Sequence, residues 1–302
     1  MSNIYSNSYN NVEKKRPVSA SAVVRIVIWS VVFCVLTGVL VASLWGHSGF
    51  SFGIDGVIGY HYDDRDYQVG NGTTSQTITD LTIDWVSGSV TVTQAEGDEI
   101  VISEDFRGED ESRLRWKVED GELTVKFCGP SWFGMDVEGD KNLTVAIPAA
   151  MLDSLDEIHV TAVSSTQDIR VSARELEIDT VSGDVTVMGT YRSVGMDTVS
   201  GNVNFEGAFK EGDFDGVSAQ AKIRLHEQAG SLDLDTVSGD LTLILSDNTT
   251  GFRVNADSIS GYVDVRGFTY ECGLDDKWGD GSMEINVDSV SGKLVVEKET
   301  KD

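Results

Sequence analysis

The sequence predicts an all-β protein: a right-handed β-solenoid of the parallel β-helix type, with about 18–22 residues per rung, preceded by one transmembrane α-helix. Three observations lead to this prediction. A seven-residue motif returns at near-constant spacing, the segments around it alternate apolar and polar residues, and an uncharged apolar stretch lies near the N-terminus. Alternation with period two is typical of strands that bury one face.

The first 46 residues predict a membrane anchor. Residues 1–22 are polar and are expected to form a cytoplasmic tail, and residues 23–46 a transmembrane helix. Its core, Ile26–Trp45, contains no charged residue and has the length that crosses a bilayer. Basic residues precede this core, whereas all but one of the 50 acidic residues follow Gly46. By the positive-inside rule we expect a single-pass protein of the cell membrane, with a cytoplasmic N-terminus and an extracytoplasmic C-terminal domain.

Two alternatives to an uncleaved anchor stay open. A cleaved signal peptide has a shorter apolar stretch and small residues at the cut, which this segment lacks. A buried soluble helix would not explain the charge asymmetry on its two sides. Residues 47–78 are rich in Gly, Ser, Asp and Tyr and are expected to form a juxtamembrane linker with little structure.

The repeat occupies the extracytoplasmic domain, predicted at residues 79–300. "DTVSGDV" begins at Asp179, "DTVSGNV" at Asp197 and "DTVSGDL" at Asp235. From Ser164 onward the motif serines are spaced by 18 residues three times and then by 20, 22 and 31. The aligned serines are Ser87, Ser164, Ser182, Ser200, Ser218, Ser238, Ser260 and Ser291.

Each unit reads as two short strands joined at the Ser-Gly pair. Two such strands cannot bury a face alone, but stacked units share one core, which favours a solenoid over the alternative, a sandwich of antiparallel hairpins. The less regular strands before Ser164 are expected to form the first rungs or a cap, because an open solenoid end would recruit other chains. The 17 residues from Gly267 to Met283 form an insertion, expected as a surface loop.

An aspartate stands three residues before the serine in all but one copy, where Thr161 replaces it. In a stacked solenoid these carboxylates form a row, and their repulsion needs compensation. Each could accept backbone N–H bonds from its own turn, with glycine supplying the freedom that the turn needs; alternatively, Ca²⁺ could bind along the row. The predicted turn column is Asp84, Asp179, Asp197, Asp215, Asp235, Asp257 and Asp288, with Gly88, Gly183, Gly201, Gly239, Gly261 and Gly292.

Several segments together resemble a family of bacterial domains, the toastrack-type "putative adhesin" family. They are "LTIDWVSGSVTV" at Leu81–Val92, "GELTVKF" at Gly121–Phe127, "NLTVAIP" at Asn142–Pro148 and the repeated units after Glu175. The resemblance covers residues 78–298. It implies an extracytoplasmic β-solenoid, often tethered by membrane helices, and it carries no catalytic residue onto this chain.

The composition and the motifs exclude several classes of function. A net charge of −27 excludes nucleic acid as a partner. The sequence lacks a nucleophile elbow, a phosphate loop and a zinc helix, and His47, His61, His159 and His226 show no ligand spacing, so we expect no catalytic residue, no metal and no cofactor. The preferred hypothesis is a non-enzymatic module for interaction, adhesion or envelope sensing. Its partners would be the bilayer, through residues 26–45, and an envelope protein or cell-wall ligand.

Two other functions remain as alternatives. A polysaccharide-active enzyme on a parallel β-helix would need two converging acids, for which the insertion at 267–283 is the best place because it contains acids beside aromatic residues. A structural protein that polymerises end to end would need uncovered terminal rungs.

The sequence leaves open whether two of the three cysteines form a disulfide. Cys34 lies inside the predicted anchor and is expected to be a small apolar side chain. Cys128 and Cys272 fall in the exported region, where they could form a disulfide or remain two unpaired thiols.

Overall fold

A computed structural model describes residues 62–130, 141–265, 268–271 and 274–298. The predicted cytoplasmic tail, the predicted transmembrane helix and the first 15 residues of the predicted linker, 47–61, lie outside these residues. Within them, no helix combines the length and the apolar character needed to cross a bilayer. The described part is almost entirely β-structure, with one short helix, α2 (Ala149–Leu152), and one 3₁₀ turn at Asp110–Ser112.

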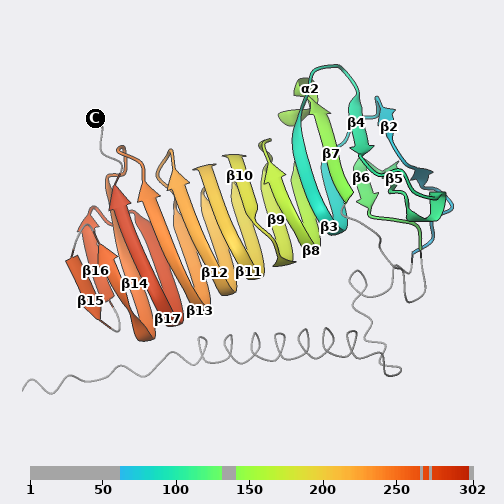
Figure 1. The fold of residues 1–302 in the computed structure, drawn as a ribbon. Helices are drawn as coiled ribbons and strands as arrows, with labels where there is room; N and C mark the ends of the chain where they lie inside the picture. The colour runs from blue at the N-terminus through green and yellow to red at the C-terminus, as the bar shows by residue number, and fades with distance from the viewer. Residues whose placement is uncertain (1–61, 131–140, 266–267, 272–273, 299–302) are drawn as a thin grey trace, which may run out of the picture.

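The repeats form the body of the molecule (Figure 1). Each repeat is a rung that pairs with its neighbours in parallel, with equivalent motif residues side by side. The rungs are β3 (Asp80–Ala95), β8 (Glu157–Ile169), β9 (Glu175–Ser182) together with β10 (Val185–Thr190), β11 (Ser193–Ala208), β12 (Glu211–Leu225), β13 (Ser231–Leu245), β14 (Gly251–Val265) and β17 (Met283–Lys298). The predicted stacking of repeat on repeat is therefore confirmed, whereas the handedness of the coil stays a prediction.

Each rung folds back on itself at the motif. A straight strand as long as β11 would span about 50 Å. Yet only two residues separate its end from β12, whose first residue, Glu211, pairs with Ser193 at the start of β11. Two intervening residues reach about 10 Å, so the two ends of β11 lie close together. Burial locates the bend: alternate residues are buried up to Thr198, and the alternation resumes one residue out of phase at Val203.

The fold-back creates two sheets that face each other across the core. We call the residues before the Ser-Gly pair the first arm of a rung and those after it the second arm. First arms pair with first arms and second arms with second arms along the whole stack. The Ser-Gly pair thus joins the two sheets, as the repeat predicted.

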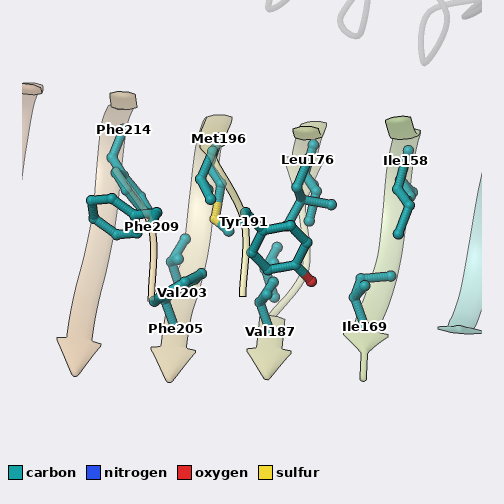
Figure 2. Packing of buried hydrophobic residues seen from close by; sticks show 14 of the residues in the cluster. Ile158, Ile169, Leu176, Val187, Tyr191, Met196, Val203, Phe205, Phe209 and Phe214 are labelled. Carbon is teal, nitrogen blue, oxygen red and sulfur yellow. The ribbon is translucent and has the colours of Figure 1, made fainter. Parts of the chain in front are cut away.

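The apolar residues of both arms meet between the sheets (Figure 2). Met196 on a first arm and Phe205 on a second arm of the same rung are both buried. Tyr191 and Phe209 come from the connections between rungs and close the open side of the core. Phe209 packs edge-on against Phe205, with ring centroids 5.3 Å apart. Because a fully buried aromatic or aliphatic side chain contributes about 1.5–3 kcal/mol, this shared core stabilises rungs that could not fold singly.

The rungs do not stack strictly in chain order. Strand β13 pairs with β17, and β14 lies on the far side of β17. The chain therefore skips one position after β13, builds β14, and returns to fill the gap with β17. The prediction of a surface loop at 267–283 is wrong, because this segment contains β15 (Phe268–Glu271) and β16 (Leu274–Gly279). Both run antiparallel along the outer edge of β14, where they satisfy backbone groups that would otherwise be exposed.

The other end of the stack is also covered. Two separate strands, β6 (Glu122–Lys126) and β7 (Lys141–Pro148), pair with the two arms of β3. Antiparallel strands extend both sheets beyond them: β1 (Gln68–Val69), β2 (Gly72–Thr74), β4 (Ile100–Glu104) and β5 (Arg115–Glu119). We call β1, β2 and β4–β7 the N-terminal cap. The cap was expected, but the linker prediction is wrong at its C-terminal end, because β1 and β2 fall within residues 47–78.

Candidate functional site

The aspartates of the motif form the predicted row. Pairing places Asp179, Asp197, Asp215 and Asp235 side by side on β9, β11, β12 and β13. The row continues through Asp288 on β17 to Asp257 on β14, and in the other direction through Thr161 to Asp84. Neighbouring strands lie about 4.8 Å apart, which sets the spacing of the row. Since Thr198 and its equivalents point inward, the aspartate before each of them lies on the outer surface of the first-arm sheet.

Two further columns on the same surface are also acidic. They lie two and four residues before the aspartates, because alternate residues of a strand share a face. On β8, β9, β11, β12, β13 and β17 these three columns contain no lysine or arginine, whereas Arg253 enters the outermost column on β14. We call their carboxylates the acidic face: Glu157, Glu175, Glu177, Asp179, Asp197, Glu211, Asp213, Asp215, Asp233, Asp235, Glu284 and Asp288.

The outer surface of the second-arm sheet differs in charge. Three basic side chains lie on it: Lys222 and Arg224 on β12, and Lys293 on β17. Met188 of β10 is exposed there as an isolated apolar side chain. Among the rungs, carboxylates are therefore concentrated on the first-arm face, so the acidic face is more than a consequence of overall composition.

Asp197 shows the combined effect of burial and of the neighbouring carboxylates on this face. The side chain is half-buried, and burial raises its pKa to about 6, with further contributions from Asp179, Asp213 and Glu177. Repulsion at this distance favours the protonated form. The central part of the acidic face therefore holds negative charge that is incompletely compensated.

Basic side chains compensate the aspartate row toward its N-terminal end. At the N-terminal end, Lys126 of β6 forms an ion pair with Asp84. Where Thr161 interrupts the row, His159 of β8 reaches Asp179 on the next rung, with Nε2 lying 3.2 Å from Oδ2. This hydrogen bond, and then the surrounding carboxylates, raise the pKa of His159 against the opposing effect of burial.

The bend itself is held by hydroxyl groups. Thr198 donates from Oγ1 to the carbonyl of Ser200, and Ser200 donates from Oγ to the carbonyl of Val181 on the preceding rung. Thr180 and Ser182 repeat this arrangement. We predicted that each motif aspartate accepts hydrogen bonds from its own turn. At Asp179 and Asp197 the described residues show no such bond, and the threonine and serine hydroxyls hold the bend instead. The physical reason is that these aspartates point outward, whereas the threonine hydroxyl lies at the bend.

Glycine is required at the bend mainly by the neighbouring rung. Gly201 has φ of 137°, and a Cβ there would lie 2.2 Å from the carbonyl oxygen of Gly183. Gly88 and Gly183 combine a positive φ with the same close approach, whereas at Gly239 and Gly292 the close approach is the constraint. Gly261 pairs with Gly292 in the same column. The backbone freedom predicted for glycine is thus confirmed at Gly88, Gly183 and Gly201.

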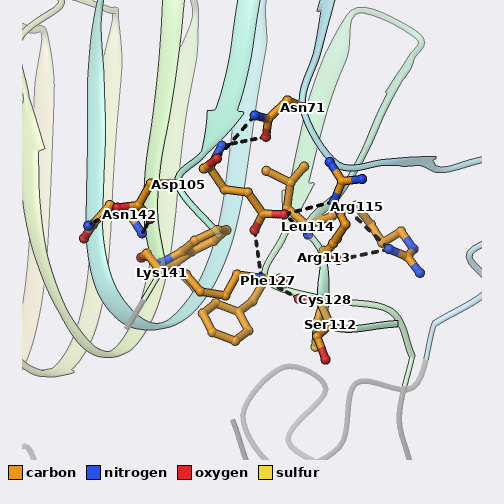
Figure 3. Close-up of polar contacts among 12 residues, drawn as sticks. Asn71, Asp105, Ser112, Arg113, Leu114, Arg115, Phe127, Cys128, Lys141 and Asn142 are labelled. Carbon is orange, nitrogen blue, oxygen red and sulfur yellow. Dashed lines mark hydrogen bonds and ion pairs between the residues drawn. The ribbon is translucent and has the colours of Figure 1, made fainter. Parts of the chain in front are cut away.

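The N-terminal cap contains a buried polar network that the sequence analysis missed (Figure 3). The Lys141 ammonium lies 2.9 Å from Oε2 of Glu104, and both side chains are fully buried. Glu104 also accepts from the backbone N–H of Leu114, and Lys141 donates to the carbonyl of Ser112. The ring of Phe127 lies 4.1 Å from the ammonium. The sequence offered two signals, a glutamate at an inward position of β4 and a lysine at an inward position of β7.

Cys128 lies beside this network as a buried free thiol. Burial raises the pKa of this thiol, although Lys141 and Arg115 act in the opposite direction. Cys272 lies outside the described residues, so the disulfide stays an untested prediction. The strands on either side of it, β15 and β16, lie at the opposite end of the stack from β6 (Figure 1), which favours the alternative of unpaired thiols.

Two described acids of the 267–283 segment, Asp275 and Asp280, have separate local partners. Asp275 pairs with Arg253 at 3.1 Å, and Asp280 accepts hydrogen bonds from Ser282 and Thr250. Trp278 stacks on Phe252, with ring centroids 5.1 Å apart. These side chains stabilise the strands that cover the end of the stack.

Residues 78–297 match the family model described as Toastrack DUF4097. No curated protein matches the chain. Three solved structures align over most of their length. A "putative cell adhesion protein" from Clostridium sporogenes ATCC 15579 is 12% identical, with 77% of this chain and 100% of that chain covered and a TM-score of 0.33.

The other two structures are named as adhesins. A "putative adhesin" from Bacteroides fragilis NCTC 9343 is 12% identical, with 76% of this chain and 97% of that chain covered and a TM-score of 0.36. A "putative adhesin" from Parabacteroides merdae ATCC 43184 is 13% identical, with 78% and 98% covered and a TM-score of 0.34.

Proposed function

This chain belongs to the Toastrack DUF4097 family, and from that premise we propose that it is a non-enzymatic, membrane-anchored module that binds cationic partners outside the membrane. The acidic face is the observation that carries the proposal. Twelve carboxylates occupy three adjacent columns of six neighbouring rungs, without a lysine or arginine among them. A field of one sign over such a surface attracts and orients ligands of the opposite sign.

The stack gives this face a fixed spacing. Pairing in register holds successive carboxylates about 4.8 Å apart, and strands cover both ends of the described stack. An extended basic peptide, or a basic segment of an envelope protein, could place its charges along such a row. Because the carboxylates are held apart before binding, the partner need not order them, which favours affinity.

The anchor defines where the module works. Residues 26–45 would cross the bilayer, leaving residues 1–22 in the cytoplasm and the β-domain, a right-handed solenoid, in the extracytoplasmic space. A module held there by a single helix suits adhesion to a wall ligand or sensing through an envelope protein. Labelling of an introduced cysteine at Ser6 and at Asp240 with a membrane-impermeant reagent in intact cells tests this: only the second should react.

Charge-matched variants test the binding surface. We expect the full chain, purified in detergent, to bind decalysine with an affinity that falls as salt increases. The triple variant Asp179→Asn, Asp215→Asn, Asp235→Asn should weaken binding at least about tenfold. The control Glu206→Gln, Asp240→Asn, Glu297→Gln removes the same charge from the second-arm face and should change affinity less than about twofold.

Two results would count against the proposal. Equal losses in the two triple variants would show that net charge, and not the acidic face, governs binding. Cleavage of cell-wall polysaccharide by the purified chain would support the enzymatic alternative instead. That alternative has no supporting observation in the described residues, since the acids at 267–283 are engaged in local contacts.

A further inference from the structure

His159 occupies an unusual position at the N-terminal end of the acidic face. It is the only imidazole in the three columns, and it stands on β8, where Thr161 interrupts the aspartate row. Its Nε2 atom lies 3.2 Å from Oδ2 of Asp179 on the neighbouring rung. Because an ionised carboxylate only accepts hydrogen bonds, this contact assigns the proton of the neutral ring to Nε2 and leaves the Nδ1 lone pair available.

Two glutamates lie beside this imidazole. Glu157 precedes His159 by two residues on β8 and therefore shares its face, and Glu177 is the direct cross-strand partner of His159 on β9. One ligand atom from each of the three side chains lies within 4.8 Å of the others. Among the described residues, neither glutamate forms an ion pair with lysine or arginine.

These distances suit a small divalent cation after minor side-chain movement. Ligand atoms about 2.0–2.1 Å from a zinc ion lie about 3.4 Å apart in a tetrahedron. Glu177 is exposed and Glu157 and His159 are partly exposed, so rotation of the side chains can close the remaining gap. The strands need not move, since the sheet already fixes the three Cα positions.

The ligand types select the class of ion. Ca²⁺ and Mg²⁺ prefer oxygen ligands alone, whereas imidazole with carboxylates is typical of zinc and neighbouring transition metals. A carboxylate that holds the second ring nitrogen of a metal-binding histidine is also a usual feature of zinc sites, and Asp179 has that place. We propose that Glu157, His159 and Glu177 bind a divalent transition-metal ion, with Zn²⁺ as the best fit and Asp179 as the residue that positions the imidazole.

Calorimetric titration of the full chain, purified in detergent without a polyhistidine tag, tests this site with Zn²⁺, Ca²⁺ and Mg²⁺ chlorides as probes. We expect one Zn²⁺ site per chain and no Ca²⁺ or Mg²⁺ site of similar affinity. His159→Ala and Glu177→Gln should each lower the Zn²⁺ affinity at least about tenfold, and Asp179→Asn should lower it by less.

His226 provides the matched control. Its Nε2 atom lies 3.3 Å from Glu206, so it is also an exposed imidazole beside a carboxylate, but it belongs to no such cluster among the described residues. His226→Ala should leave Zn²⁺ binding unchanged. The proposal is wrong if Zn²⁺ does not bind, if His159→Ala binds as the unaltered chain does, or if any loss of a carboxylate from the acidic face weakens binding equally. Decalysine binding by His159→Ala would be retained if the proposed function holds, which separates the two proposals.

Discussion

The ammonium of Lys141 lies 2.9 Å from the carboxylate of Glu104, and both side chains are excluded from solvent inside the N-terminal cap. Such a pair adds little net stability compared with a well-packed apolar pair, but removal of one partner leaves a buried charge uncompensated. This distinction gives the first prediction.

Glu104→Gln should destabilise the chain by about 3–5 kcal/mol, because the buried ammonium of Lys141 would lose its counter-ion. Burial already lowers the pKa of Lys141, and loss of the glutamate would lower it further. Urea denaturation followed by circular dichroism measures the change. The control is Glu119→Gln, which removes the acid of an exposed pair with Lys117 and should change stability by less than about 1 kcal/mol. Similar effects of the two variants would contradict the prediction.

Gly201→Ala should destabilise the stack by about 2–3 kcal/mol, because a Cβ at this position would lie 2.2 Å from a backbone oxygen on the next rung. The atom met is a backbone oxygen and not the end of a flexible side chain, so the backbone of one of the two rungs would have to shift. Gly195→Ala is the control on the same strand, since a Cβ there meets no atom within 4 Å. The denaturation midpoint should fall for the first variant only. A stable Gly201→Ala chain would mean that the bend tolerates a side chain.

The sequence predicted the aspartate row because a repeat of constant length brings equivalent residues into register, and the contacts of His159 follow from the same register. Adding the 18-residue period to His159 gives Glu177, so the cluster was within reach of sequence analysis. The signal was missed because ligand spacing was sought along the chain and not across rungs. Periodicity therefore contains more information about sites than a linear motif does.

The repeat does not predict two other features of the fold. The motifs of β14 and β17 are nearly the same, so nothing in them shows that β17 takes the place beside β13. That order depends on β15 and β16, which fit only an outer edge. The pair of Glu104 and Lys141 was equally inaccessible, because the cap has no repeat that would show that β4 and β7 pair side by side.

Ser289→Thr should stabilise the chain by up to about 1 kcal/mol. A cavity of about 20 Å³ lies at the bend among β13, β14 and β17, and the buried hydroxyls of Thr236 and Ser289 beside it have no hydrogen-bond partner. Threonine at 289 would add a methyl group to this space, and burial of one methyl contributes about 0.8 kcal/mol. The melting temperature should rise. Thr198→Ser is the converse control. It should lower the melting temperature, because it removes a buried methyl group from the equivalent position of another rung. A fall in both variants would show that the cavity cannot accept the methyl.

Asp197→Asn should make the chain more stable at neutral pH and reduce the dependence of stability on pH. The pKa of Asp197 rises from 3.8 to about 6 on folding, so the folded chain binds this proton more strongly than the unfolded chain. The contribution of Asp197 is therefore most favourable below pH 3.8 and is lost as the pH rises toward 6. Because the side chain is partly exposed, we expect solvent screening to limit the gain at pH 7 to about 1 kcal/mol. Denaturation midpoints measured from pH 4 to pH 7 should decline less steeply in the variant than in the unaltered chain. Asp240→Asn, on the second-arm face, should leave that slope unchanged. An unchanged slope in Asp197→Asn would mean that neither burial nor the neighbouring carboxylates raise the pKa of Asp197 in the folded chain.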